Sequence, residues 1–506
     1  MSADVVSEGE GNEAQGEGQQ GVGATHSTEE AGEPARGDPV EGRGRRATEP
    51  PEGKTQGIPS PVHVLTKLRR VAELARGAPD MAFTSLSHHI DVEFLKEAHA
   101  RTRKNAASGV DGQTAADYQQ DLEGNLQGLL GRLKSGTYRA PNVKRVHIPK
   151  GDGSKTRPIG IPTFEDKVLQ RAVHMLLEPI YEEDFLDCSY GYRPGRSAHG
   201  ALEAVRSALM KTGGGWVLEA DIQGFFDHLD HAHLRTFLDR RVRDGVLRRV
   251  LHKWLKAGVL ESGQVTYPED GTPQGGVISP LLANVYLHEV LDRWFKEQIE
   301  PRLKGRAVLI RFADDFVIVF SEESDARRVE EVLPKRFERF GLRLHPEKTR
   351  LFPFQRPRRG PRAPEGPKGH FDFLGFRHHW RRSRRGNWVV GQKTMSSRLT
   401  RAIRSVSAWC RRYRHSEVGW QHRVLSQKVR GHYGYYGITG NSDALKNFHR
   451  QVQRAWRKWL ERRSQRGLMT WERFNRLLER YPLPPPVVVR SIYRTQRVRS
   501  SRSRMR

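Results

Sequence analysis

With 506 residues the chain is too long for one ordinary domain, and its formal net charge of +28 at pH 7 makes it strongly basic. No apolar run approaches the roughly 18 residues of a membrane-spanning helix, and no apolar secretory stretch opens the sequence, so we expect a cytoplasmic protein without membrane contact. Its two distant cysteines, Cys188 and Cys410, exclude a Cys-rich zinc site.

The first segment in chain order is a predicted disordered tail over residues 1–60, which is rich in Gly, Glu, Ser and Pro and poor in apolar side chains. This tail holds twelve Asp or Glu against five Lys or Arg, so the remaining chain carries about +35. A basic surface also serves solubility. The uneven distribution instead favours a polyanionic partner, because neutralising phosphates releases counterions.

Helical spacing follows the tail. Apolar residues recur at this spacing over 62–75, and Asp91 has the position of an N-cap ahead of a second short helix. A turn-rich link covers 105–112, and an amphipathic pattern over 118–133 predicts a helix that Gly136 ends.

A basic β-hairpin is predicted next, with strands over 143–149 and 156–161 around a Gly-Asp-Gly turn. Helices are expected over 164–186 and 197–212. The apolar run 216–222 is consistent with a buried strand.

Carboxylates stand at the ends of predicted strands. Asp221 ends the strand 216–222, while Asp314 and Asp315 form the tip between strands 307–312 and 316–320. Asp pairs in tight turns are often structural, because Asp accepts local backbone hydrogen bonds. A strand-borne Asp upstream in a very basic chain favours catalysis instead. Phosphodiester synthesis uses two cations about 4 Å apart, and Mg²⁺ prefers oxygen ligands. We expect two Mg²⁺ ions, replaceable by Mn²⁺, with the Ile222 carbonyl as a further ligand.

The chain resembles reverse transcriptases encoded by bacterial group II introns over roughly residues 65–480. Phe-Ala-Asp-Asp at 312–315 is similar to the Tyr-Ala-Asp-Asp box of the family. Residues 220–228 resemble its first metal motif, which implies that Asp221, Asp314 and Asp315 are catalytic. The same motif implies that Phe226 blocks a ribose 2′-hydroxyl.

Two further motifs imply a dNTP site. Residues 272–280 resemble the nucleotide-pocket loop, in which Gln274 contacts the nucleotide and Gly275 permits close backbone approach. Residues 148–162 resemble the hairpin that grips the triphosphate. Arg157 is its first candidate, and Lys150 and Lys155 compete for the second phosphate contact.

Residues 191–199, which include Arg193 and Arg196, resemble a motif of this branch that contacts template RNA. Lys348, within 345–349, matches a position that protonates the leaving pyrophosphate, although a solvated surface lysine is an alternative. Phe373-Leu374-Gly375-Phe376 is similar to the segment that supports the primer terminus.

The region 396–463 resembles the maturase thumb, where basic and aromatic side chains alternate. Such side chains suit RNA contact, and the aromatics also suit a helical core; we expect both uses. Apolar residues between Leu445 and Trp459 share one helical face. The RNA-binding candidates are Arg430, Tyr433, Tyr435, Tyr436, Arg450 and Arg454.

The resemblance implies an α+β right-hand polymerase, with fingers and an antiparallel palm sheet, followed by an α-helical thumb. We expect no His-Asn-His endonuclease domain. Expected partners are intron RNA or an RNA template, a DNA primer or target and dNTPs, in a monomer or homodimer. A splicing-only maturase, or a free-standing enzyme of repair or phage defence, stays open. The predicted parts are the tail 1–60, a helical extension 61–135, fingers and palm 136–376, the thumb 377–480 and a flexible basic tail 481–506.

Overall fold

The computed structural model describes residues 62–150, 155–261, 263–267, 271, 275–357, 369–464 and 468–491. All of these belong to the second of two units, Gly44–Arg506. The predicted disordered tail 1–60 lies outside the described residues, as does 492–506 at the other end. No helix in the described ranges is long and apolar enough to cross a membrane.

Four helices open the described chain, and their ends confirm the sequence signals. The Asp91 carboxylate accepts a hydrogen bond from the Phe94 amide, as an N-cap does. The helix predicted over 118–133 is divided at Asp121, and Gly136 ends it in the left-handed conformation with φ 78°. These helices are α1 Val62–Gly77, α2 Val92–Arg101, α3 Ala115–Gln120 and α4 Leu122–Ser135.

The predicted basic hairpin forms one edge of a four-stranded sheet, which we call the hairpin sheet. Its strand order is β2-β1-β4-β5, in which β1 pairs antiparallel with β2 and parallel with β4. The strands are β1 Val143–Lys150, β2 Lys155–Ile161, β4 Val259–Glu261 and β5 Gln264–Thr266.

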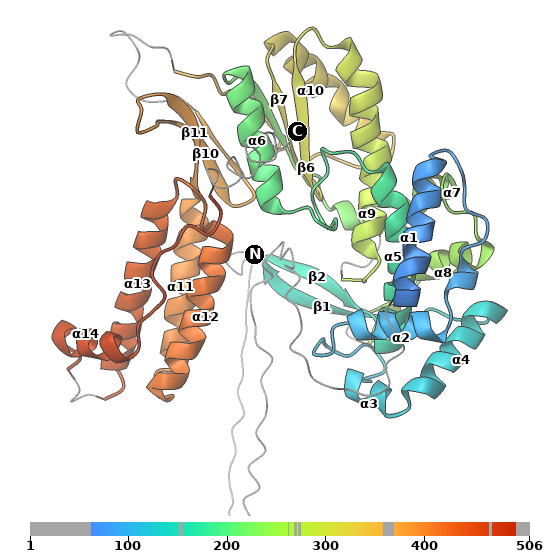
Figure 1. Ribbon diagram of the computed structural model, residues 1–506, viewed down its shortest axis with the longest axis horizontal. Helices are drawn as coiled ribbons and strands as arrows, with labels where there is room; N and C mark the ends of the chain where they lie inside the picture. The colour runs from blue at the N-terminus through green and yellow to red at the C-terminus, as the bar shows by residue number, and fades with distance from the viewer. Residues whose placement is uncertain are drawn as a thin grey trace, which may run out of the picture. The chain divides into compact units, whose positions relative to one another are not determined.

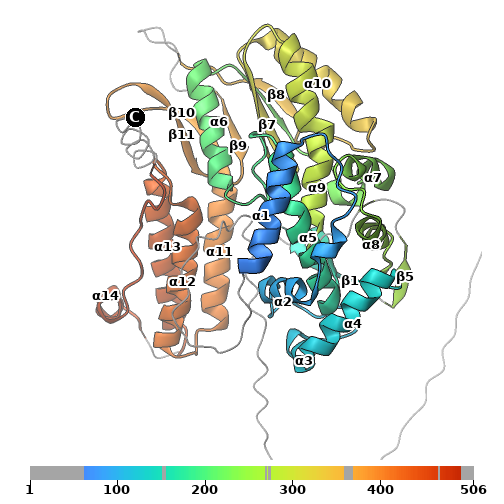
Figure 2. The same ribbon diagram turned by 45° about the vertical axis from the view of Figure 1, so that its right-hand side comes forward.

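A second four-stranded sheet, the central sheet, has the order β6-β7-β3-β8 and is antiparallel throughout. Side chains alternate across it: Phe316 and Ile318 pack in the core that holds helix α10, while Val317 packs in the core that holds α6. Figures 1 and 2 show α6 and α10 on opposite sides of β7. Burial of both faces explains why these strands read as continuous apolar runs. The strands are β3 Trp216–Ala220, β6 Ala307–Phe312, β7 Asp315–Phe320 and β8 Arg350–Pro353.

The helices around the two sheets include a long, irregular one, in which α9 continues into π-helical turns at His288–Asp292 and Phe295–Ile299. The α-helices are α5 Phe164–Asp184, α6 Ala198–Thr212, α7 His231–Asp239, α8 Gly245–Leu255, α9 Ser279–Leu287 and α10 Glu323–Glu338.

A third sheet, order β11-β10-β9, begins at His370, before the predicted domain boundary at 377, and extends to Thr394 in the segment predicted as an α-helical thumb. The predicted domain boundary at 377 falls within β10, and the first helix of this part starts at Ser396, so the strands before Ser396 were not predicted. Alternate residues of β10, among them Phe376 and Trp380, are buried while their neighbours are partly exposed. The strands are β9 His370–Phe373, β10 Phe376–Arg382 and β11 Trp388–Thr394.

Four helices complete the described fold, and we call them the C-terminal bundle. The apolar face predicted between Leu445 and Trp459 forms the centre of its core. The segment 481–491, predicted to be flexible, contacts the bundle: Leu483 is buried, and the Arg490 amide donates to the Gly437 carbonyl at 2.9 Å. The helices are α11 Ser396–Arg412, α12 Val418–Tyr436, α13 Ser442–Glu461 and α14 Trp471–Arg480.

Candidate active site

The strand register of the central sheet brings the three predicted catalytic carboxylates to one end. Ala220 on β3 pairs with Phe316 on β7, so in this antiparallel pair Asp221 stands next to the start of β7 at Asp315. Asp314 lies in the turn between Phe312 and Asp315, which we call the carboxylate tip.

The other neighbour of β3 brings Lys348 to the same place. Glu219 pairs with Arg350 at the start of β8, and Lys348 lies in the turn just before that strand. The Lys348 ammonium contacts the Asp221 carboxylate, and half of the Lys348 side chain remains exposed. Lys348, the predicted proton donor, thus lies at the end of the sheet where the carboxylates stand and contacts a candidate metal ligand.

The Ile222 backbone forms a bridge with Leu344. Its hydrogen bonds come from the flanking residues: the His345 amide donates to the Asp221 carbonyl, and the Gln223 amide donates to Arg343, both at 2.8 Å. This is the pattern of a pair in which the central residues do not bond to each other. The Ile222 carbonyl is therefore directed away from this bridge.

Within the described ranges, no group of three His, Cys, Asp or Glu side chains has the spacing of a metal site. The donor set nevertheless fits a hard divalent cation, because the backbone register places three Asp residues at one end of the sheet and such cations prefer carboxylate oxygens. Asp221, Asp314 and Asp315 are the residues that would hold it.

Phe226 lies in the short turn Phe225–Asp227 that follows Asp221, and its ring packs on Phe225 with centroids 5.4 Å apart. Gly271 passes directly over this turn, since a Cβ on Gly271 would lie 2.7 Å from the Phe226 carbonyl oxygen. The half-buried Phe226 is thus placed beside the start of the predicted nucleotide-pocket loop.

The other end of that loop meets the hairpin sheet. Gly275 has φ 119°, and a Cβ there would lie 2.5 Å from the Gly160 carbonyl oxygen on β2. This close approach is to a strand of the protein, and the predicted approach of Gly275 to a nucleotide stays a prediction. Gln274 lies outside the described residues. In the hairpin Arg157 pairs with Ile148 and Lys150 pairs with Lys155, so the backbone does not decide between the two lysines.

A buried glutamine that the sequence analysis missed holds the pocket loop. Gln170 on α5 accepts from the Val277 amide at 2.7 Å through Oε1, and its Nε2 donates to Asp166 at 2.9 Å. Asp166 also accepts from Trp254 at 2.7 Å and from the Tyr138 hydroxyl. Burial, opposed by these hydrogen bonds, raises the pKa of Asp166 to about 6. Polar residues on an otherwise apolar helix were the available signal.

Arg193 is buried and engaged within the protein, and its predicted template contact stays a prediction. Its side chain is 3% exposed and forms an ion pair with Glu182 at 2.9 Å. It also donates to the backbone carbonyls of Leu186 and Ser189. Arg196 is more accessible and pairs with Asp187 at 2.5 Å, so its predicted template contact stays a prediction.

The aromatic RNA-binding candidates of α12 are engaged within the protein. Tyr433 is buried in the bundle core, with its hydroxyl 3.0 Å from His449, which is the core-filling use expected of these aromatics; its RNA contact stays a prediction. The Tyr435 hydroxyl donates to the Leu374 carbonyl at 2.8 Å, and the Tyr436 ring packs on Phe376. Both half-buried tyrosines fasten the bundle to the β9–β10 turn.

The basic candidates differ from the tyrosines. Arg430 on α12 and Arg450 and Arg454 on α13 are exposed. Two of them lie four residues apart on one face of α13, opposite the apolar face. Their RNA contacts stay predictions.

Comparison with known proteins identifies the family. The reverse transcriptase (RNA-dependent DNA polymerase) family matches residues 148–378, which include the carboxylate tip and strand β2 of the hairpin. The chain is 36% identical over 356 residues to Protein YkfC of Escherichia coli, and the match covers 64% of this chain and 90% of that protein. The chain belongs to the family of reverse transcriptases and intron maturases.

Other relatives of this reverse transcriptase family member are matched over less of their length. Group II intron-encoded protein LtrA of Lactococcus lactis is 36% identical over 251 residues, which are 47% of this chain and 41% of LtrA. The putative COX1/OXI3 intron 1 protein of Saccharomyces cerevisiae is 29% identical over 217 residues, 43% of this chain and 26% of that protein. The chain thus spans less than half of the length of LtrA.

Proposed function

We propose that this chain is an RNA-directed DNA polymerase of the group II intron type, which extends a primer 3′-hydroxyl with dNTPs on an RNA template. The observation that carries the proposal is the register that aligns Asp221 with the carboxylate tip. In this proposal the hairpin sheet is the fingers, the central sheet the palm and the C-terminal bundle the thumb of a right-hand polymerase.

The proposed chemistry follows from the strand ends. Two bound Mg²⁺ ions would supply activation of the primer hydroxyl and neutralisation of the triphosphate. Asp221, Asp314 and Asp315 bind them, with the Ile222 carbonyl as a further ligand. These oxygens stand on strands whose apolar bodies are buried, which restricts their movement. Lys348 donates a proton to the departing pyrophosphate, since an ammonium group beside the carboxylates is suited to that step.

The nucleotide site is proposed to lie between the hairpin sheet and the pocket loop. The close approach of Gly275 to Gly160 brings the loop to β2, the strand that carries Arg157. Arg157, with Lys150 or Lys155, grips the triphosphate, and Gln274 contacts the nucleotide. Phe226, beside the loop at Gly271, excludes a ribose 2′-hydroxyl.

We further propose that the bundle binds intron RNA to assist splicing and mobility. The exposed Arg430, Arg450 and Arg454 supply phosphate contacts, in keeping with the basic charge of the chain. A splicing-only protein would not require three carboxylates at one end of the central sheet, and this favours the polymerase.

Primer extension tests the proposal. The purified chain is expected to incorporate dNTPs on a primed RNA in Mg²⁺, and EDTA is expected to stop the reaction. The double variant Asp314→Ala plus Asp315→Ala is expected to lose incorporation while it keeps its affinity for the primed RNA. Normal incorporation by this variant would refute the assignment.

A further inference from the structure

An arginine stands directly before the carboxylate tip, inside a strand that is otherwise apolar. Arg311 on β6 is fully buried, with 0% exposure. Burial alone disfavours a charged guanidinium, but the buried Asp292 outweighs this effect, and the pKa of Arg311 lies above its ordinary value. A buried charge of this kind is retained where its partners hold it in one arrangement.

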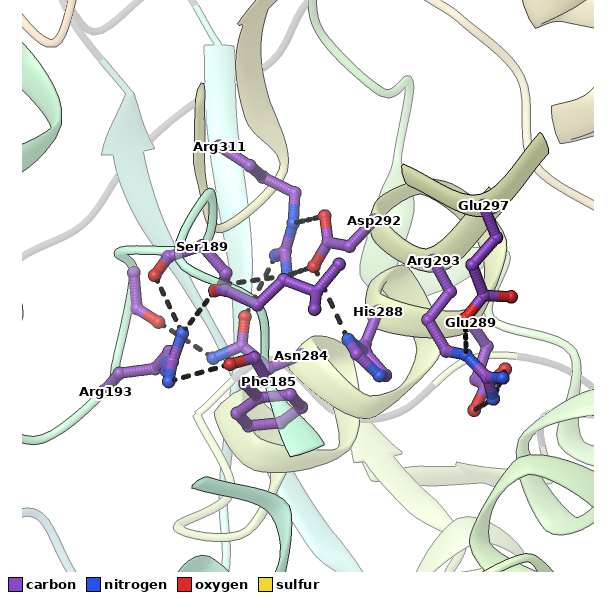
Figure 3. A network of polar contacts seen from close by, with 12 residues as sticks. Phe185, Ser189, Arg193, Asn284, His288, Glu289, Asp292, Arg293, Glu297 and Arg311 are labelled. Carbon is purple, nitrogen blue, oxygen red and sulfur yellow. Dashed lines mark hydrogen bonds and ion pairs between the residues drawn. The ribbon is translucent and has the colours of Figure 1, made fainter. Parts of the chain in front are cut away.

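Each of the three nitrogens of the Arg311 guanidinium donates a hydrogen bond to at least one oxygen (Figure 3). Asp292 accepts from Nε at 2.8 Å and from Nη2 at 2.6 Å, in a bidentate pair. The Asn284 side chain and the Ala313 carbonyl both accept from Nη1 at 3.0 Å, and the Ser189 hydroxyl accepts from Nη2 at 2.8 Å. Arg311 therefore joins three segments: the long helix, the carboxylate tip and the loop after α5.

The contact with the tip falls on its conformationally demanding residue. Ala313 has φ 56°, a left-handed backbone that a residue with a Cβ rarely adopts. Its carbonyl, which accepts from Arg311, precedes Asp314 directly. Fixing this carbonyl fixes the turn from which Asp314 and Asp315 project.

The same network holds the loop that packs against the tip. Asn284 accepts from Arg311 and donates to the Gly191 carbonyl at 2.8 Å. Gly191 is so near that a Cβ on it would lie 2.4 Å from the Ala313 nitrogen. The loop and the carboxylate tip therefore pack directly against each other, and Arg311 donates hydrogen bonds to both.

The long helix supplies its two polar side chains through an irregular turn. Asn284 lies on α9, and Asp292 ends the π-helical turn His288–Asp292. Residues eight apart on a regular α-helix differ in direction by roughly 80°. A wider turn changes this relation, and π-turns are frequent at functional sites. Here both side chains reach the same guanidinium.

We propose that Arg311 and Asp292 are positioning residues that fix the left-handed turn of the carboxylate tip and so preset Asp314 and Asp315 for divalent metal. The inference rests on the proposed function. Loss of the bidentate hydrogen bonding of Arg311 is therefore expected to weaken metal binding at the tip while the chain stays folded.

Arg311→Lys is the first test, because a lysine keeps the charge but cannot bind Asp292 and Ala313 in the same fork. Arg241→Lys is the matched control: Arg241 is also buried, pairs with Asp184 at 3.0 Å and donates to carbonyls of the segment 75–81, at a different place in the fold. Both variants are compared with the unmodified chain for Mn²⁺ affinity by electron paramagnetic resonance, without nucleotide, and for melting temperature.

Arg311→Lys is expected to weaken Mn²⁺ binding at least fivefold and to raise the Mg²⁺ concentration for half-maximal incorporation. Arg241→Lys is expected to lower only the melting temperature. Equal Mn²⁺ affinities of Arg311→Lys and the unmodified chain would overturn the inference, whereas failure of the unmodified chain to bind Mn²⁺ would overturn the proposed function as well. If Arg311→Lys does not fold, Ser189→Ala, which removes a single hydrogen bond, is expected to shift the Mn²⁺ affinity in the same direction. An unshifted affinity in that variant would equally contradict the inference.

Discussion

Replacement of Gln170 by Leu is expected to raise the KM for dNTPs while the chain stays folded. Leucine has a similar volume but offers no acceptor to the Val277 amide, which is 2.7 Å from Oε1 in the structure. It also offers no donor to Asp166. The pocket loop then loses the contact that fastens its end to α5.

The size of the effect follows from the unpaired amide. A buried donor without an acceptor costs about 1–3 kcal/mol. If the pocket loop avoids this cost by moving away from α5, the population of the arrangement that binds dNTPs falls roughly 5- to 150-fold, since about 1.4 kcal/mol is a factor of ten. The Val277 amide is only partly buried, so we expect an effect of roughly tenfold, toward the lower part of this range.

Steady-state single-nucleotide incorporation on a primed RNA measures this change. The control is Gln392→Leu, which removes another buried glutamine. Gln392 lies on β11 of the third sheet, and its Nε2 donates to the Leu202 carbonyl of α6 at 2.8 Å. Both variants are expected to lose stability, and only Gln170→Leu is expected to raise KM. A KM unchanged in Gln170→Leu, with the fold intact by circular dichroism, would refute the role given to Gln170.

Three more predictions concern pH, the tip and RNA. Burial raises the pKa of Asp166 from 3.8 to about 6, so its contribution to stability, about 3 kcal/mol, is complete below pH 3.8 and is lost as pH rises to about 6. Asp166→Asn should flatten the pH dependence of the free energy of unfolding, measured with urea over this window. A pH dependence as steep as that of the unmodified chain would contradict the prediction. Gly191→Ala forces a Cβ to within 2.4 Å of the Ala313 nitrogen and should lower incorporation at least tenfold, whereas full activity would show that the loop does not need this approach. Arg450→Ala plus Arg454→Ala should reduce the salt dependence of RNA binding by about two phosphate contacts, which filter binding at several salt concentrations measures; an unchanged slope would exclude this face.

Local signals predicted much of the fold. The Asp91 cap, the Gly136 stop and the hairpin strands are fixed by short-range geometry, and the structure has them where the sequence indicated. The sheet that begins at His370 was missed because arginines alternate with its buried aromatics. On β10 the alternation of buried Phe376, His378 and Trp380 with partly exposed neighbours was the signal of a strand.

Side-chain roles were less predictable than elements. Arg193 and Tyr433 became RNA-binding candidates through the motifs that contain them, yet both side chains are buried by long-range packing that a motif does not report. Arg311 was read as part of an apolar strand. A lone arginine there, with Asn284 and Asp292 on an apolar helix, was a sign of a buried polar network.

The alignment of Asp221 with the carboxylate tip is the central claim, and one measurement tests it directly: dNTP incorporation by Asp221→Asn compared with Glu219→Gln. Glu219 lies two residues earlier on the same strand and pairs with Arg350 at 2.7 Å, so it matches the charge and the strand but not the proposed metal contact. We predict that Asp221→Asn loses incorporation by a factor of at least about 100, roughly 2.7 kcal/mol in the barrier, while Glu219→Gln retains most of it. Equal activities of the two variants would contradict the account.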